Sequence, residues 1–405
     1  GEWKPLSNSY LQEPQDGYDV QTTLDVNIQD VTHHALLGAL ENFEADHGTA
    51  IVMESETGAI RSVANLGRTK EGKYYEKLNY AIGESHEPGS TFKLMALVAA
   101  LEDKVIDTTT VFDTQNGELT FYGKYKVRDS RKGGYGKIPI SEIFERSSNT
   151  GMVQAIYNEY NSKPEQFVNR LMNMGLSEPL GLPIVGEAKP VIPHPDKKGW
   201  SGISLPWMAY GYGVLMTPMQ TLTFYNAIAN DGVMVRPRFI ENTQNTRSQI
   251  KKKSEVEIIN PSICSKETIG KVKSMLKGVV EKPWGTAHNI YDPNFAISGK
   301  TGTCQLDYNT EEVQYVASFV GYFPSDQPKY SCIVVIHRPD KEKGYFGNQV
   351  AAPVFQTIAH KLYSSIPRET KLSRDRYLEI TGNKNETNQS LVEADVKLTK
   401  TQKKS

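Results

Sequence analysis

Strand-like runs occur at both ends of this 405-residue chain, and helical patterns fill the stretch between them. The apolar runs cover residues 49–53, 60–64, 295–305, 315–323 and 330–338. Short connections between successive runs favour antiparallel pairing. One sheet must therefore combine strands from the two ends of the chain, and the helices between them form an insertion.

We expect an α/β protein of the α+β type, with a central antiparallel five-stranded sheet flanked by helices and an inserted all-helical subdomain. Helical spacing of apolar residues predicts the helices. They are expected at residues 27–42, 164–174, 217–230, 267–280 and 351–363. We expect a linker remnant at 1–16, the main domain at 17–364 with its helical subdomain at about 100–235, and a polar tail at 365–405.

The composition is that of an ordinary globular protein, with 38% hydrophobic and 23% charged residues. A formal net charge of -1 gives no reason to expect nucleic-acid binding. No stretch approaches the roughly 18 apolar residues that cross a bilayer. The sequence begins with Gly1 rather than Met. The absence of an anchor from this sequence therefore says little about the native protein.

Cys264, Cys304 and Cys332 are an odd number of cysteines, so at least one has no intrachain partner. They form neither a Cys-x-x-Cys pattern nor a Cys/His cluster, and the sequence predicts no metal. No phosphate-binding glycine motif is present either, so we expect no cofactor. Cys304 lies near the end of the apolar run 295–305, and we interpret it as a packed strand residue rather than a nucleophile.

The pattern Ser-x-x-Lys occurs three times, and one copy has a context that suits catalysis. Ser90, with Lys93, follows a Glu-Pro-Gly turn signal and opens a long apolar run. At the start of a buried helix, free N–H groups favour a developing oxyanion, and Lys93 lies one turn from Ser90 on the same face. The copies that begin at Ser248 and Ser274 lie in a polar run and within a predicted helix, so we interpret both as non-catalytic.

Two further motifs follow Ser90 in the chain. They are Ser147-Ser148-Asn149 and Lys300-Thr301-Gly302-Thr303. With Ser90 and Lys93 they supply a nucleophile, two lysines, a second hydroxyl and an amide, a set for acyl transfer without a histidine. Taken alone, the first motif would be interpreted as a helix cap and the second as a strand with a glycine bulge. Their occurrence together and in this order favours the catalytic interpretation.

With these motifs the chain resembles the transpeptidase domain of class B penicillin-binding proteins, most of all the cell-division (septal) type. The resemblance covers roughly residues 17–364 and implies the penicillin-binding-protein/β-lactamase-like fold. Glu87, before the Pro-Gly pair, favours the septal over the elongation type. The other matching segments are residues 50–53, 57–60, 182–183, 186–187, 210–213, 217–218, 220, 285–287 and 317–324.

The resemblance implies roles for the catalytic residues. Ser90 would be the acylated nucleophile, and Lys93 would be its general base. Lys93 must then be neutral, which requires a pKa lowered by burial and by the positive charge of Lys300. Ser147 would relay a proton toward the leaving amine, and Asn149 would hold Lys93 and the substrate amide.

The resemblance also implies how the substrate is bound. Lys300, Thr301 and Thr303 would bind its terminal carboxylate. Gly302 would leave the strand edge clear for the approach of the substrate backbone. The backbone N–H groups of Ser90 and Thr303 would form the oxyanion hole.

The implied activity is that of a serine-type D-Ala-D-Ala transpeptidase, which cross-links peptidoglycan stem peptides in septal cell-wall synthesis and is inhibited by β-lactams. Implied partners are stem peptides, β-lactam antibiotics and cell-division membrane proteins, with no nucleic acid. The implied location is the cell envelope, at the outer (periplasmic) face of the cytoplasmic membrane. The resemblance also implies a native N-terminal anchor that this sequence lacks. A D,D-carboxypeptidase, a β-lactamase or a β-lactam sensor on the same fold is the alternative.

A β-lactamase of class A needs a glutamate that activates water for deacylation. Glu165 is the nearest candidate. The sequence Ser-Lys-Pro-Glu from Ser162 to Glu165 instead predicts a capping box, in which Glu165 reaches back to the backbone N–H of Ser162. We therefore expect slow hydrolysis of an acyl-enzyme.

Overall fold

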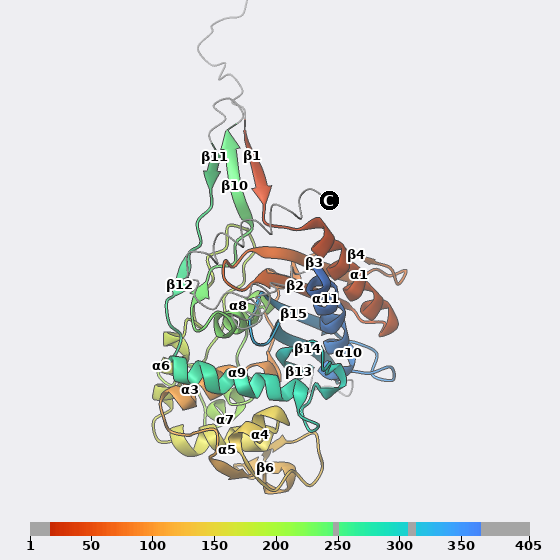
Figure 1. Cartoon of the computed structure of the whole chain (residues 1–405). Helices are drawn as coiled ribbons and strands as arrows, with labels where there is room; N and C mark the ends of the chain where they lie inside the picture. The colour runs from red at the N-terminus through yellow and green to blue at the C-terminus, as the bar shows by residue number, and fades with distance from the viewer. Residues whose placement is uncertain (1–16, 246–250, 307–312, 366–405) are drawn as a thin grey trace, which may run out of the picture. The chain divides into compact units, whose positions relative to one another are not determined.

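The computed structural model describes residues 17–245, 251–306 and 313–365, and its centre is a six-stranded antiparallel sheet (Figure 1). The strands, in order across the sheet, are β13 (Ser298–Leu306), β14 (Gln314–Phe323), β15 (Tyr330–His337), β2 (His47–Glu54), β3 (Ile60–Arg68) and β4 (Tyr74–Tyr75). Strand β15 pairs with β2, so that Ile333 lies opposite Ile51. The prediction of one antiparallel sheet built from both ends of the chain is confirmed.

Strand β4 is the difference from the expected five strands. It contains two residues and lies at the edge of the sheet beside β3. Such a strand is too short for alternation of apolar and polar residues to reveal it. The Tyr74 hydroxyl lies 2.8 Å from the carbonyl oxygen of Leu40 and 2.6 Å from that of Ala45, which fixes β4 to the end of the first helix and the residues just after it.

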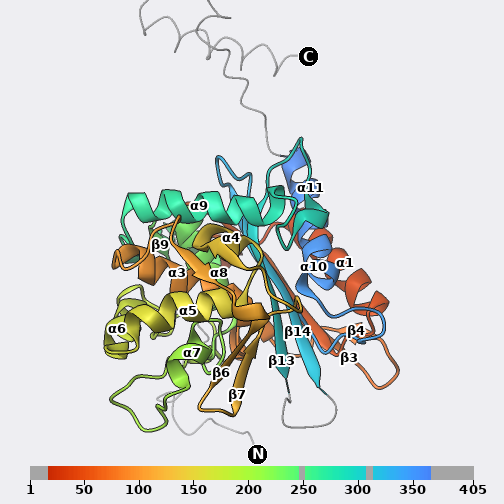
Figure 2. The same cartoon turned by 90° about the horizontal axis from the view of Figure 1, so that it is seen from below.

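Helices cover both faces of the sheet (Figure 2). Helix α1 (Val26–Asn42) packs on β2 and β3, and α11 (Ala352–Ser365) lies on the same side. Helix α8 (Pro218–Ala229) packs on β14 and β15 from the other side and is buried along its whole length. Helix α9 (Lys266–Glu281) packs beside β13. These four helices and α6 (Pro164–Asn173) confirm the five predicted from apolar spacing, with ends within two residues.

The insertion between β4 and α8 contains helices α2 (Tyr80–Gly83), α3 (Lys93–Glu102), α4 (Ile140–Glu145), α5 (Asn149–Tyr160), α6 and α7 (Ser204–Met208). The expectation that it is all-helical is wrong, because it also holds two small antiparallel sheets. These pair β5 (Val111–Asp113) with β8 (Lys137–Pro139), and β6 (Glu118–Phe121) with β7 (Tyr125–Arg128). In the β6–β7 turn, Tyr122 and Gly123 have φ values of 51° and 67°, the left-handed conformation that tight hairpins favour.

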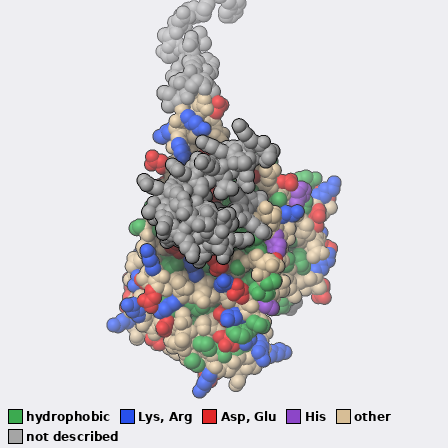
Figure 3. Space-filling model, viewed as in Figure 1, with side chains coloured by type: hydrophobic (Ala, Val, Ile, Leu, Met, Phe, Trp, Pro, Cys, Tyr) green, Lys and Arg blue, Asp and Glu red, His purple; other side chains and the backbone are tan. Residues whose placement is uncertain are grey.

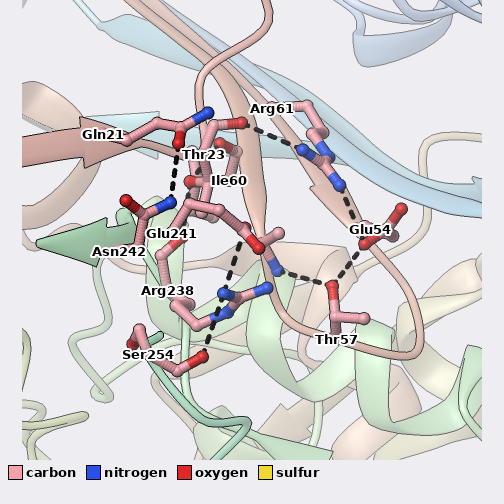
Figure 4. A network of polar contacts seen from close by, with 11 residues as sticks. Gln21, Thr23, Glu54, Thr57, Ile60, Arg61, Arg238, Glu241, Asn242 and Ser254 are labelled. Carbon is pink, nitrogen blue, oxygen red and sulfur yellow. Dashed lines mark hydrogen bonds and ion pairs between the residues drawn. The ribbon is translucent and has the colours of Figure 1, made fainter. Parts of the chain in front are cut away.

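A separate three-stranded sheet consists of β1 (Tyr18–Thr22), β10 (Ile240–Asn245) and β11 (Lys251–Lys253). Polar contacts attach its base to the central sheet (Figure 4). The Thr23 hydroxyl lies 2.8 Å from the carbonyl oxygens of both Ile60 and Arg238. The Arg61 guanidinium donates to the Thr23 carbonyl and to Glu54. This base therefore joins three segments that are far apart in the sequence.

The remaining elements are β9 (Met234–Val235), which pairs with β12 (Ile258–Asn260), and the short helix α10 (Gly347–Val350).

On the face that Figure 3 shows, side chains of both charge signs are interspersed. Over the described ranges, no helix has the length and hydropathy that a membrane span needs. The three cysteines are buried and free, as their odd number predicted for at least one. The expected linker 1–16 and nearly all of the expected tail, 366–405, lie outside the described residues.

Candidate active site

Ser90 lies in a single 3-10 turn, Gly89–Thr91, that leads into α3. The sequence predicted Ser90 at the start of a helix, and the α-helix itself begins at Lys93. Gly89 has a φ of 54°, and its N–H donates to the Gly211 carbonyl at 3.1 Å. A Cβ on Gly211 would collide with the Gly89 carbonyl oxygen. The two glycines therefore let the Ser90 turn lie directly against the segment at residue 211.

Lys93 has a fully buried side chain that contacts the second motif. Its Nζ lies 2.7 Å from the Ser147 carbonyl oxygen, 3.2 Å from the Ser147 hydroxyl and 2.6 Å from Oδ1 of Asn149. Burial lowers the pKa of Lys93 to about 7, and the negative charge of Asp129 opposes this shift. Lys93 is thus substantially neutral near neutral pH, as a general base must be.

Lys300, on β13, is a second fully buried lysine that reaches the same hydroxyl. Its Nζ lies 2.8 Å from Oγ of Ser147 and 3.2 Å from the Thr301 carbonyl oxygen. Burial, followed by the charge of Lys93, lowers the pKa of Lys300 well below its ordinary value. Burial is the first cause of both shifts, and the expected repulsion between the two lysines appears in the lowered pKa of Lys300.

Ser147 is in the left-handed backbone region, with a φ of 57°. Residues other than glycine seldom adopt this conformation, and the surrounding structure must hold it. In Ser147 it turns the carbonyl toward Lys93 and places the hydroxyl between Lys93 and Lys300. The motif predicted the residue, but no sequence pattern signals its conformation.

Asp129 orders the start of α5, and the sequence analysis missed it. Its carboxylate accepts hydrogen bonds from the Ser148 hydroxyl, at 2.9 Å, and from the backbone N–H groups of Asn149 and Thr150, at 2.6 and 3.0 Å. The Thr150 hydroxyl also donates to it at 2.9 Å. A carboxylate is favoured there because a helix N-terminus has unpaired N–H groups and a positive dipole end. No motif links these positions in sequence, since Asp129 reaches α5 through the β6–β7 hairpin.

Asn149 is held at both ends of its side-chain amide. Oδ1 accepts the hydrogen bond from Lys93, and Nδ2 donates to the Arg128 carbonyl at 2.7 Å. An amide nitrogen carries two hydrogens, so one remains for another acceptor. The contact with Lys93 agrees with the role that the family implies, and the contact with a substrate amide stays a prediction.

The third motif lies on β13, an edge strand of the central sheet that packs against the Ser90 turn. The hydroxyls of Thr301 and Thr286 lie 2.8 Å apart, and the Gly347 N–H donates to the Thr303 hydroxyl at 3.0 Å.

Ser90 itself is partly exposed, and its hydroxyl makes no hydrogen bond within the described part of the chain. The hydrogen bond between a catalytic nucleophile and its base often forms only when substrate is bound.

Gly302 lies against β14 and against the turn that carries Ser90. A Cβ at this position would collide with Oγ of Ser318 and would lie 3.0 Å from Cγ2 of Thr91 and 3.4 Å from the Pro88 carbonyl oxygen. The missing side chain makes room for the turn that carries Ser90. That Gly302 also clears the strand edge for the substrate backbone stays a prediction.

The other candidate nucleophiles lie in different environments. Ser274 is exposed on α9, and Lys277 of the same pattern pairs with Asp326 at 3.2 Å, so the prediction of an ordinary helix residue is confirmed. Ser248 lies outside the described residues. Cys304 is buried in β13, and burial raises the pKa of its thiol to about 12, which suits a packed strand residue.

Glu165 is exposed in the first turn of α6. The helix is capped by Lys163 without a side-chain hydrogen bond, so the predicted capping box of Ser162 and Glu165 is wrong. Pro164 occupies the first helical position, as predicted. Its fixed φ angle favours the start of α6 without a side-chain hydrogen bond from the capping residue.

Comparison with known proteins identifies the family of the chain. Residues 48–360 match the family model described as penicillin binding protein transpeptidase domain. Among curated relatives, the peptidoglycan D,D-transpeptidase FtsI of Buchnera aphidicola subsp. Baizongia pistaciae is 29% identical over 85% of this chain and 58% of its own length. The stage V sporulation protein D of Bacillus subtilis is 27% identical over 85% of this chain and 53% of its own. The chain thus spans little more than half the length of these relatives.

Solved structures give the same result. Penicillin-binding protein 3 of Mycobacterium tuberculosis in complex with ampicillin is 28% identical and aligns with a TM-score of 0.74 over 86% of this chain and 78% of that one. The transpeptidase domain of Burkholderia pseudomallei penicillin-binding protein 3 aligns with a TM-score of 0.71 over 87% and 98% of the two chains, at 28% identity. The chain belongs to the penicillin binding protein transpeptidase domain family.

Proposed function

We propose that this chain is the catalytic domain of a serine D,D-transpeptidase that cross-links peptidoglycan stem peptides during septal wall synthesis. One observation carries the proposal: two fully buried lysines, Lys93 and Lys300, meet at the Ser147 hydroxyl beside the turn that presents Ser90. Relatives named peptidoglycan D,D-transpeptidase and a relative's structure with bound ampicillin support it.

In the first half-reaction, Oγ of Ser90 attacks the carbonyl carbon of the penultimate D-alanine. Lys93, neutral because it is buried, takes the hydroxyl proton. Negative charge then develops on the carbonyl oxygen. The backbone N–H groups of Ser90 and Thr303 stabilise that charge as an oxyanion hole.

The tetrahedral intermediate collapses when the carbon–nitrogen bond to the terminal D-alanine breaks. The leaving nitrogen needs a proton, and the Ser147 hydroxyl, in contact with both lysines, passes one to it from Lys93. An ester on Ser90 remains. The amine of a second stem peptide then attacks this ester, loses a proton to the same group, and forms the new amide while Ser90 regains its hydrogen.

The terminal carboxylate of the substrate would bind at the hydroxyls of Thr301 and Thr303. Lys300, whose Nζ contacts Ser147 and the Thr301 carbonyl, would add positive charge behind them, because a carboxylate nearby favours the protonated form of a lysine. The free edge of β13 offers backbone groups to an extended peptide in the way that strand addition does.

The test is a reaction of a stem-peptide mimic ending in D-Ala-D-Ala with an amine acceptor. We expect release of D-alanine together with the new amide, and neither product from Ser90→Ala. Release of D-alanine with only hydrolysed donor would make the domain a carboxypeptidase. Stable penicilloylation without either product would favour a β-lactam sensor.

We expect the rate of acylation by a penicillin to rise with pH through about 7 and then to level off. Lys93 accepts a proton only when it is neutral, and its pKa lies at about 7, so protonation below that pH removes the base. The rate should fall about tenfold per pH unit on the acid side. Stopped-flow acylation of protein shown to be folded at each pH measures this. A profile that is flat, or that falls as the pH rises, would contradict the role of Lys93.

We expect the penicilloyl-enzyme to be long-lived. Glu165 is exposed on α6, and over the described residues no carboxylate forms a hydrogen bond with Ser90 or Lys93 that would let it activate water. Nitrocefin should therefore be turned over slowly, and Glu165→Gln should leave the rate unchanged. Rapid multiple turnover that Glu165→Gln abolishes would make the chain a β-lactamase.

We further propose that residues 17–364 form the transpeptidase domain, with the residues before and after it as linker and tail. Cross-linking of septal peptidoglycan requires that the domain act at the outer face of the cytoplasmic membrane. Cell-division membrane proteins are its proposed partners there.

A further inference from the structure

A cluster of histidines lies where β2 begins and β15 ends, apart from the motif residues. His47 is the first residue of β2 and His337 the last of β15, and the two are direct partners across the strand pair. Their rings stack with centroids 4.3 Å apart. The Tyr80 ring stacks on His47 at 4.2 Å, and His86 meets His337 edge-on at 5.1 Å. These neighbours hold both imidazoles in position.

Glu84 completes this cluster from the C-terminal end of α2. Its Oε2 lies 2.7 Å from Nε2 of His47 and 3.5 Å from Nε2 of His337. The three ligand atoms all lie within 4.8 Å of one another. Tetrahedral zinc with bonds of about 2.0–2.2 Å separates its ligand atoms by about 3.3 Å. The two distances to Glu84 lie on either side of that value, so small side-chain rotations would suffice to bind an ion.

The surroundings of the cluster are those of a metal site. Nδ1 of His47 lies 3.0 Å from the Asp46 carboxylate, so it can donate its hydrogen there and leave Nε2 as the ligand atom. The side chains of His47 and His337 are 10% and 7% exposed, and that of Glu84 is 30% exposed, which gives an ion one route to solvent. Nδ1 of His86, next to His337, is buried and makes no hydrogen bond within the described residues.

We propose that His47, Glu84 and His337 bind a divalent transition-metal ion of the zinc type. Imidazole ligands with one carboxylate favour zinc over magnesium or calcium, which prefer oxygen ligands alone. The ion would tie the ends of β2 and β15 to Glu84. The segment from Glu84 leads through His86 to Gly89 and the Ser90 turn. The site would thus brace the chain that positions the nucleophile, independently of which reaction the domain catalyses.

The sequence predicts no metal because the cysteines form no ligand pattern and no other closely spaced ligands stand out. His47, Glu84 and His337 come from three distant segments, and only the antiparallel pairing of β2 with β15 brings the two histidines together. No spacing rule would reveal this set.

The test uses the full chain, stripped of metal with a chelator, titrated with Zn²⁺ in a calorimeter and with Co²⁺ by visible absorption. We expect one ion per chain, a tetrahedral Co²⁺ spectrum, and a rise of the thermal midpoint with Zn²⁺ concentration. Glu84→Gln should weaken Zn²⁺ binding at least about tenfold, and Asp46→Asn about ten- to a hundredfold. His34→Gln is the matched control, because His34 pairs with Asp30 on the exposed face of α1 and should bind Zn²⁺ as wild type does.

Each outcome decides for or against the site. Loss of binding in His47→Gln with the fold retained, as judged by circular dichroism, supports it. If His47→Gln fails to fold, Glu84→Gln and Asp46→Asn carry the test, since both keep side-chain size at partly exposed positions. Absence of Zn²⁺ binding by the wild type, or binding that Glu84→Gln and Asp46→Asn leave unchanged, overturns the proposal.

Discussion

Ser90→Ala is expected to abolish covalent labelling by penicillins. The substitution removes one oxygen atom at a partly exposed position whose hydroxyl makes no hydrogen bond within the described residues, so the fold should be unaffected. The glycines that shape the turn, Gly89 and Gly211, remain. Without Oγ no ester can form. Intact mass spectrometry after incubation with a penicillin should show the unmodified mass, whereas the wild type gains one adduct.

Ser274→Ala is the matched control for this experiment. Ser274 begins another Ser-x-x-Lys pattern, is exposed on α9 and lies within a regular helix. Its variant should be labelled at the wild-type rate. An adduct that persists in Ser90→Ala with unchanged stoichiometry would show that another residue is the nucleophile.

Lys93→Ala is expected to slow acylation about a hundred- to ten-thousandfold, the usual cost of losing a general base. Lys300 remains, but its Nζ is directed at Ser147, and no hydrogen bond joins it to Ser90 within the described residues. Because the fully buried Lys93 contacts Ser147 and Asn149, its truncation also leaves a cavity and unpaired acceptors. Stopped-flow acylation should therefore be measured at a temperature at which circular dichroism shows the variant folded.

Two further variants make the result of Lys93→Ala interpretable. Lys93→Met keeps the volume of the side chain and removes only its amine, so it should lose as much rate with less effect on stability. Lys277→Ala removes the lysine of the Ser274 pattern, which pairs with Asp326 at the surface, and should change the rate little. Acylation of Lys93→Met within a few-fold of wild type would show that the base is another group.

The sheet could be predicted from the sequence because its strands are continuous apolar runs buried on both faces. Strands β14 and β15 are buried over almost their whole length, and their boundaries agree closely with the predicted runs. The small sheets could not be predicted. Strand β1 is exposed throughout and pairs with β10, more than 200 residues later, so neither apolar periodicity nor a local turn signals the pair. The strands of the β6–β7 hairpin have only four residues each, too few for apolar periodicity to reveal them.

The site residues could be identified from their motifs, but their arrangement could not. The pattern Ser-x-x-Lys placed Lys93 one turn from Ser90, and the structure turns its amine toward Ser147 and Asn149 instead of into a hydrogen bond with Ser90. The left-handed backbone of Ser147 and the hydrogen bonds of Asp129 depend on loops whose conformation has no sequence signature. Motifs specify which groups take part, whereas long-range packing decides which of them touch.

The central claim is that Ser90 forms the acyl-enzyme, and mapping the modified residue tests it most directly. Wild-type protein labelled with a penicillin is digested and its peptides are sequenced by mass spectrometry. We predict one adduct per chain on the peptide that contains Ser90, at its hydroxyl. An adduct on Ser248, Ser274 or Cys304, or the absence of any adduct from folded protein, would contradict the account.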